Sequence, residues 1–157
     1  DESALQYKHY RDIANGHYQD LKFAKTNANK VVFSDTDFVA TQVFAETYEG
    51  KPHPIVQEFI DDVRFDLTIL LDNSTKWVDD GMRMIGADDA RAKFQQDLKD
   101  KYKENGIGYV EVKTSDYLLR YEAVKVIVDV FLKRRATVQE LQTIVDKFIK
   151  GNERIAE

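Results

Sequence analysis

Two aspartates, Asp35 and Asp37, follow a short β-branched and aromatic run at residues 30–34 and precede a stretch of helical periodicity that begins at Phe38. An aspartate directly after a buried strand can organise Mg²⁺, usually through water, as in the Walker-B arrangement, and Asp35 fits that role. Asp37 could accept a hydrogen bond from a substrate hydroxyl or act as a general base. The alternative is that Asp37 caps the helix that begins at Phe38, and the two roles are compatible.

The segment "WVDDGMR" at residues 77–83 brings together Trp77, the paired acids Asp79 and Asp80, Gly81 and Arg83. A guanidinium matches phosphate oxygens with a fixed fork of donors, so Arg83 could close over a transferring phosphate. The neighbouring glycine would let such a flap move. The alternative is a solvated acidic loop in which only the tryptophan packs against the core.

A tyrosine and three histidines are further candidates. Tyr48 precedes Gly50 by two residues, and an exposed tyrosine there could stack on a flat ring, especially a cationic one. The alternative is an ordinary core or rim tyrosine. The histidines predict no metal site, because His9 and His17 lack a third ligand and His53 stands alone between two prolines.

The elements that must position these residues follow from apolar periodicity and from turn residues. Three- and four-residue steps predict helices at 4–28, 38–49, 54–61, 88–104, 117–131 and 137–150. Asn15-Gly16 leaves a kink or break in the first helix open as an alternative. We expect a capping box of Thr137 and Glu140 to begin the last helix and Gly151 to end it. Short apolar runs predict strands at 30–34, 67–71 and 109–112.

Strands separated by helices predict parallel pairing, and hence an α/β layered fold. In such folds ligands bind beyond the carboxyl ends of the strands. Asp35 and Asp37 follow the first predicted strand, Asp72 follows the second, and Thr114 and Ser115 follow the third. We therefore expect these polar residues to converge at one edge of the sheet, with the segment 73–86 as a long loop or flap.

Composition narrows the class of protein. With 157 residues, one domain over 1–157 is expected, and its net charge of −5 argues against a nucleic-acid partner. The absence of cysteine excludes disulfides and thiolate metal sites. No apolar run approaches the roughly 18 residues that a membrane span needs, so we predict a cytoplasmic protein without membrane contact.

A phosphoryl-transfer enzyme that uses a Walker-B type aspartate also needs the loop G-x-x-x-x-G-K-[ST], whose backbone N–H groups hold the phosphates. This chain has no such loop, because Gly50-Lys51 is followed by Pro52 and Ala45 stands where the first glycine should be. We therefore expect these residues alone to be inactive.

Three stretches together resemble one family: "DTDFVATQVFAETYEGKPHP", "RFDLTILLDNSTKWVDDGMRMIG" and "SDYLLRYEAV" are similar to the ribosylnicotinamide kinase domain of NadR-type NAD-biosynthesis proteins. The resemblance covers roughly residues 5–131. It implies a P-loop kinase fold that transfers the γ-phosphate of ATP to the ribose 5′-hydroxyl of ribosylnicotinamide, which gives nicotinamide mononucleotide. Such proteins also carry an adenylyltransferase domain and sometimes a helix-turn-helix repressor domain.

The resemblance also implies roles for individual residues. Asp35 would organise Mg²⁺, Asp37 would contact the nucleoside and act in catalysis, and Tyr48 would stack on the nicotinamide ring. The lid would supply the remaining catalytic and substrate contacts: Arg83 toward the phosphates, with Trp77, Asp79 and Asp80 toward the substrate. The adenine of ATP would be flanked by Tyr117, Arg120 and Tyr121.

Family members place a P-loop strand, and then a second strand with a Trp-Glu-Tyr-Gly-Arg type motif, ahead of the segment that this chain matches. We expect these parts in a longer parent chain, and the P-loop strand would lie between the predicted strands at 30–34 and 67–71. The expected fold is thus an incomplete P-loop-kinase-like domain. The alternative functions are a non-catalytic nucleotide-sensing or regulatory module of a larger NAD-biosynthesis regulator, and an unrelated α/β domain whose aspartates are only caps.

Overall fold

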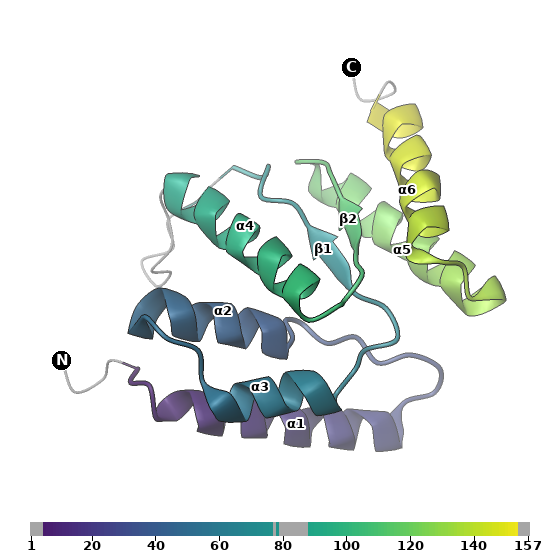
Figure 1. The fold of residues 1–157 in the computed structure, drawn as a ribbon. Helices are drawn as coiled ribbons and strands as arrows, with labels where there is room; N and C mark the ends of the chain where they lie inside the picture. Colours follow the sequence, from purple (N-terminus) through teal and green to yellow (C-terminus); the bar gives the residue numbers. More distant parts are fainter. Residues whose placement is uncertain (1–4, 77, 79–87, 154–157) are drawn as a thin grey trace. The chain divides into compact units, whose positions relative to one another are not determined.

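The computed structural model describes residues 5–76, 78 and 88–153 (Figure 1). The described elements, in chain order, are α1 (His9–Asn27), α2 (Phe38–Glu49), α3 (Pro54–Asp62), β1 (Ile69–Leu71), α4 (Asp88–Glu104), β2 (Val110–Val112), α5 (Tyr117–Arg134) and α6 (Val138–Glu153). They form two compact units. Unit 1 holds the described residues up to Arg64 together with Asp97–Asn105, and unit 2 holds those of 65–96 and 106–157. Helix α4 therefore contributes residues to both units.

Unit 1 is built from α1, α2 and α3, with the C-terminal half of α4. Helix α3 runs alongside α1, and α2 packs against both (Figure 1). Apolar side chains from these helices are removed from water, and this burial is the main force that holds the unit together. The buried apolar residues of α1 to α3 are Tyr10, Ala14, Leu21, Phe38, Val39, Ala40, Val43, Ala45, Val56 and Ile60. The Phe38 ring also stacks on Phe59, with centroids 5.1 Å apart.

The helix ends of unit 1 follow from local sequence signals. Gly50 has a φ of 75° and its N–H donates to the Glu46 carbonyl at 3.0 Å, so α2 ends in the left-handed conformation that glycine adopts without strain. Pro54 occupies the first turn of α3, where a missing N–H costs nothing. The buried His53 caps that helix through Nδ1, which accepts from the Ile55 N–H at 3.2 Å.

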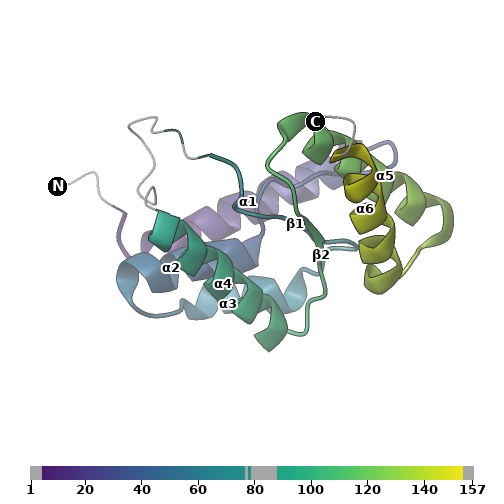
Figure 2. The ribbon, with the colours of Figure 1, turned by 90° about the horizontal axis from the view of Figure 1, so that it is seen from above.

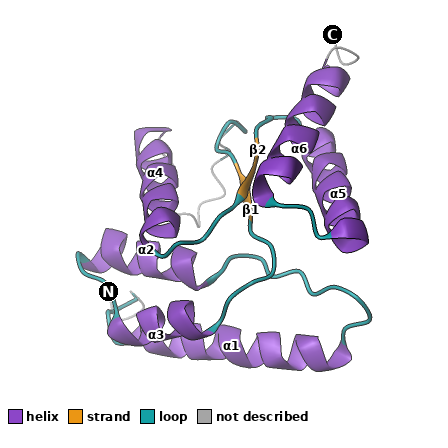
Figure 3. Cartoon of the chain, turned by 45° about the vertical axis from the view of Figure 1, so that its right-hand side comes forward, coloured by secondary structure: helices purple, strands orange, loops and turns teal. Residues whose placement is uncertain are grey.

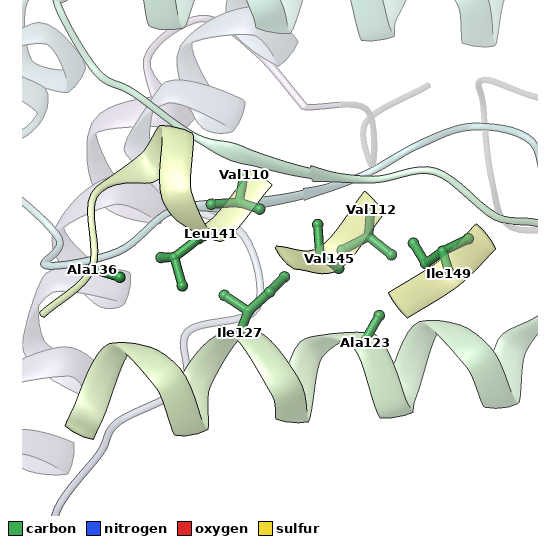
Figure 4. Close-up of a cluster of buried hydrophobic side chains, with 8 residues drawn as sticks. All are labelled: Val110, Val112, Ala123, Ile127, Ala136, Leu141, Val145 and Ile149. Atoms are coloured by element: carbon green, nitrogen blue, oxygen red, sulfur yellow. The ribbon is translucent and has the colours of Figure 1, made fainter. Parts of the chain in front are cut away.

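Unit 2 contains a parallel pair of short strands, in which Ile69 of β1 lies opposite Val110 of β2 (Figure 3). Helices α5 and α6 run side by side (Figure 2), and α6 and α5 both pack on β2. Ile127 and Ala123 point from α5 toward the side chains of β2 and α6 (Figure 4). The complete buried cluster is Val110, Val112, Ala123, Ile127, Ala136, Leu141, Val145 and Ile149.

The structure confirms the predicted helices to within a few residues, and it confirms two of the three strands. The Thr137–Glu140 capping box is present, since the Glu140 N–H donates to Thr137 Oγ1 at 3.1 Å. Helix α1 continues without a break through Asn15-Gly16. The expected end of the last helix at Gly151 was wrong, because Gly151 lies inside α6. The predicted loop or flap lies largely outside the described residues.

The predicted strand at 30–34 is also wrong, because these residues form no regular structure. A strand requires a neighbour to receive its N–H and C=O groups, and in the described part of the chain the sheet consists of β1 and β2 alone. Val31 and Val32 are half-buried and Phe33 is exposed, so the run has apolar side chains without a ladder. The parallel sheet is thus smaller than predicted. Among the described residues, no helix is both long and apolar enough to cross a membrane.

Candidate functional site

Asp37 lies at the start of α2 and both of its carboxylate oxygens are hydrogen-bonded. Oδ1 accepts from the Ala40 N–H at 2.8 Å, which confirms the capping interpretation. Oδ2 accepts from the hydroxyl of Tyr102, a buried residue of α4, also at 2.8 Å. Each carboxylate oxygen has a second lone pair, so Asp37 can accept a further hydrogen bond while it remains fixed.

The turn before Asp37 is strained. Thr36 has a φ of 68°, which is unusual for a β-branched residue. Ser34 Oγ donates to the Thr36 carbonyl at 2.8 Å and also contacts Nε2 of His17 at 2.8 Å. Strained backbone of this kind persists only where the surrounding structure holds it in place. It is found most often at ligand-binding and active sites.

Asp35, the predicted metal ligand, is exposed on this turn. Among the described residues no group of three or more His, Asp or Glu side chains could hold a metal ion. Mg²⁺ in nucleotide sites needs only one or two carboxylates, since waters and substrate phosphates complete its coordination. A single exposed carboxylate is therefore compatible with that chemistry.

Tyr48 lies at the other end of α2, 37% exposed, with its ring parallel to that of Phe44 at a centroid distance of 6.0 Å. Burial raises the pKa of the Tyr48 phenol, which extends the range of alkaline pH over which the phenol stays neutral. Eleven residues of helix place the Cα atoms of Asp37 and Tyr48 about 16 Å apart. Helical side chains generally lean toward the helix N-terminus, and a nucleoside that touches both residues must extend along α2.

In unit 2 the carboxyl ends of β1 and β2 are joined by Arg120 of α5, which is only 8% exposed. Its Nε donates to the Thr114 carbonyl at 2.7 Å. Its Nη2 donates to the Asp72 carbonyl at 2.6 Å and to Asp72 Oδ1 at 2.7 Å. Arg120 therefore fixes the two strand ends. Its Nη1 makes no hydrogen bond to the described residues.

Two tyrosines near the start of α5 are open to solvent. Tyr117 is 73% exposed and Tyr121, one turn later, is 61% exposed. Lys125 Nζ lies 5.3 Å from the centroid of the Tyr121 ring. Exposed aromatic rings one turn apart on a helix can receive a flat base by stacking.

The structure groups the predicted residues in two places. Asp35, Asp37 and Tyr48 belong to unit 1, and Asp72, Thr114 and the three α5 residues belong to unit 2. The expected convergence of all these residues at one edge therefore stays a prediction. The predicted lid residues lie outside the described residues: Trp77, Asp79, Asp80 and Arg83.

Sequence reasoning missed two groups that hold the Asp35–Asp37 turn. Tyr102 bonds Asp37 across 65 positions of the chain, and His17 bonds Ser34 across 17. Neither pair has a spacing that any local motif describes, so no sequence signal could have found them.

An aspartate turn that leads into a helix, together with parallel strands whose carboxyl ends carry polar residues, is typical of α/β nucleotide-binding domains. Residues 3–120 match the family described as AAA domain, and the chain belongs to this family of P-loop domains. The similarity to NadR proteins that the motifs predicted is confirmed by two relatives.

Both relatives carry the name trifunctional NAD biosynthesis/regulator protein NadR. The protein of Salmonella typhimurium is 55% identical over 117 residues, which is 74% of this chain and 28% of the relative. The protein of Escherichia coli K12 is 52% identical over 121 residues, which is 77% of this chain and 30% of the relative. The chain thus spans less than a third of the length of these relatives.

Proposed function

We propose that the domain to which this chain belongs phosphorylates ribosylnicotinamide with ATP to give nicotinamide mononucleotide. The 5′-oxygen of the ribose bonds to the γ-phosphorus, the bond from that phosphorus to the β,γ-bridging oxygen breaks, and ADP leaves. The hydroxyl proton is released in the same reaction. The observation that carries the proposal is the similarity, over three quarters of the chain, to proteins named for NAD biosynthesis.

The geometry of the Asp35–Asp37 turn supports separate roles for its two carboxylates. Asp35 is exposed and can hold Mg²⁺ through water, where the ion would neutralise charge on the phosphates. Asp37 is anchored by two donors, and this suits it to orient the ribose hydroxyl by accepting its hydrogen bond. Phosphoryl transfer through a loose transition state depends mainly on positioning and electrostatics, so an anchored acceptor serves it well.

The other contacts belong to the same proposal. Tyr48 would stack on the nicotinamide ring, which is cationic in ribosylnicotinamide. Tyr117 and Tyr121 would flank the adenine, and Arg120 would act there by holding the strand ends. The lid contacts would come from Trp77, Asp79, Asp80 and Arg83. The P-loop and the remaining domains would belong to the longer parent chain.

The direct test is to assay the complete gene product for Mg²⁺- and ATP-dependent phosphorylation of ribosylnicotinamide. Asp35→Asn should lower turnover by at least about 100-fold, since it removes a charge that stabilises the metal and the transition state. The unfolding midpoint should not change, because Asp35 makes no hydrogen bond to the described residues. Asp20→Asn, at another exposed aspartate in unit 1, is the matched control and should keep full activity. Wild-type turnover in Asp35→Asn would remove this residue from the site.

The second candidate is a nucleotide-sensing module, and it is favoured by the word regulator in the names of both relatives. Titration calorimetry on the same protein separates the two. Binding of ATP or ribosylnicotinamide without any product formation would support the sensing module and contradict the kinase.

A further inference from the structure

Two side chains that the proposed reaction does not use hold the turn that carries Asp35. Ser34 Oγ bonds the carbonyl of the strained Thr36, and Ser34 Oγ lies 2.8 Å from Nε2 of His17 on α1. A left-handed, β-branched residue persists only where neighbouring groups hold it in place. The conformation of the turn therefore depends on the Ser34 hydroxyl.

Proton counting gives the direction of these hydrogen bonds. A serine hydroxyl has one proton, and Ser34 donates it to the Thr36 carbonyl. The Ser34 oxygen must then be the acceptor in its contact with His17, so Nε2 of His17 carries a proton. Nε2 is a donor in this way whether or not Nδ1 is protonated too. A hydrogen-bond chain thus runs in one direction, from His17 through Ser34 to Thr36.

The imidazole that begins this chain is itself fixed. The His17 ring packs against the ring of Phe38, the first residue of α2, with centroids 4.8 Å apart. His17 is in the middle of the 19-residue helix α1, so its backbone is also held. The hydrogen-bond chain therefore connects helix α1 to the turn directly before α2.

The two aspartates differ in how much they depend on this chain. Asp37 has its own anchors in the Ala40 N–H and the Tyr102 hydroxyl. Asp35 is exposed and has no hydrogen bond to the described residues, so only the backbone of the turn sets its direction. A change in the turn should therefore move Asp35 much more than Asp37.

We propose that His17 and Ser34 are positioning residues for Asp35, which they hold where it receives the Mg²⁺ of the phosphate donor. This inference rests on the proposed function. It adds a specific expectation: loss of either residue should weaken the response to Mg²⁺ more than the binding of the nucleoside.

The test uses the complete gene product and measures the half-saturating Mg²⁺ concentration together with the KM for ribosylnicotinamide. His17→Phe keeps a ring against Phe38 but has no donor, and Ser34→Ala removes the hydroxyl. Each should raise the half-saturating Mg²⁺ concentration about threefold to tenfold, the range that one hydrogen bond is worth, with a smaller change in KM. His17→Gln places an amide N–H near the position of Nε2 and should restore the wild-type value.

Thr36→Gly tests the strain itself. Glycine adopts positive φ without steric cost, so the unfolding midpoint should stay the same or rise. The released turn should nevertheless raise the half-saturating Mg²⁺ concentration. A residue with only a structural role would not combine unchanged or higher stability with a weaker response to Mg²⁺.

The outcomes separate this inference from the proposed function. If Asp35→Asn is inactive and His17→Phe responds to Mg²⁺ like the wild type, the positioning role is refuted and the kinase proposal stands. If the wild type itself gives no product, the kinase proposal fails. In that case ¹⁵N NMR of the His17 ring decides whether the hydrogen bonds from His17 through Ser34 to Thr36 exist. A neutral ring with its proton on Nδ1 refutes the chain, whereas a protonated Nε2 whose proton exchanges faster in Ser34→Ala supports it.

Discussion

At the scale of single residues, Asp37 serves two elements at once. Its Oδ1 caps α2 through the Ala40 N–H, and its Oδ2 accepts from Tyr102 of α4. The cap could be predicted from sequence, because an aspartate before a helical pattern is a local signal. The hydrogen bond from Tyr102 could not be predicted from sequence, because it depends on the packing of α4 in unit 1.

Tyr102→Phe should therefore lower the free energy of unfolding by about 1 to 2 kcal/mol, because it removes a hydrogen bond to a charged group and keeps the ring. Urea unfolding measures this change, and the KM for ribosylnicotinamide should rise in parallel. Tyr18→Phe is the matched control. Tyr18 is a half-buried tyrosine of unit 1 whose ring packs on Phe59 and whose hydroxyl has no hydrogen bond in the described structure. Equal effects of the two substitutions would show that the Asp37 bond contributes nothing.

At the scale of elements, local signals predicted where helices begin and end, and non-local pairing decided what became a strand. The helix at 38–49 was predicted with its bounds because Asp37 is a local start signal and Gly50 is a local stop signal. The run at 30–34 has the composition of a strand, but a strand also needs a neighbour, which composition does not provide. The link between α2 and α3 was likewise not predictable: the wholly buried Gln42 exchanges two hydrogen bonds with the backbone of His53, at 2.9 and 3.0 Å.

Gln42→Leu should destabilise the protein by about 2 kcal/mol, as judged by urea unfolding. The His53 carbonyl keeps a bond from the Gln57 N–H, but the His53 N–H would be left buried without an acceptor. Leucine has a similar volume, so a cavity adds little to this cost. Gln19→Leu, on the exposed face of α1, is the control and should change stability by less than about 0.5 kcal/mol. If both variants unfolded at the same urea concentration, the two hydrogen bonds between Gln42 and His53 would contribute nothing to stability.

At the scale of the whole molecule, α4 is the element that both units share. In unit 2, Arg91 donates to the carbonyls of Asn73 and Thr75, each at 3.1 Å. In unit 1, Lys101 pairs with Glu46 at 2.6 Å. Burial disfavours the charge on Lys101, but the hydrogen bonds that Lys101 donates to Glu46 and Glu104 outweigh this effect and raise the pKa of Lys101, so the ion pair persists up to alkaline pH. The sequence predicted this helix from its periodicity and gave no sign that it is divided between two units.

Because a helix forms cooperatively, α4 should make the two units unfold together. Gln96→Pro breaks α4 where the units divide, since proline lacks the N–H of residue 96 and its ring clashes with the preceding turn. We expect a loss of about 3 kcal/mol and, by hydrogen exchange with mass spectrometry in urea, separate unfolding of peptides from α2 and from α6. Gln96→Ala preserves the helix, so in this variant the peptides from α2 and from α6 should unfold in a single transition. Separate transitions in the wild type, or one transition in Gln96→Pro, would mean that α4 does not couple the units.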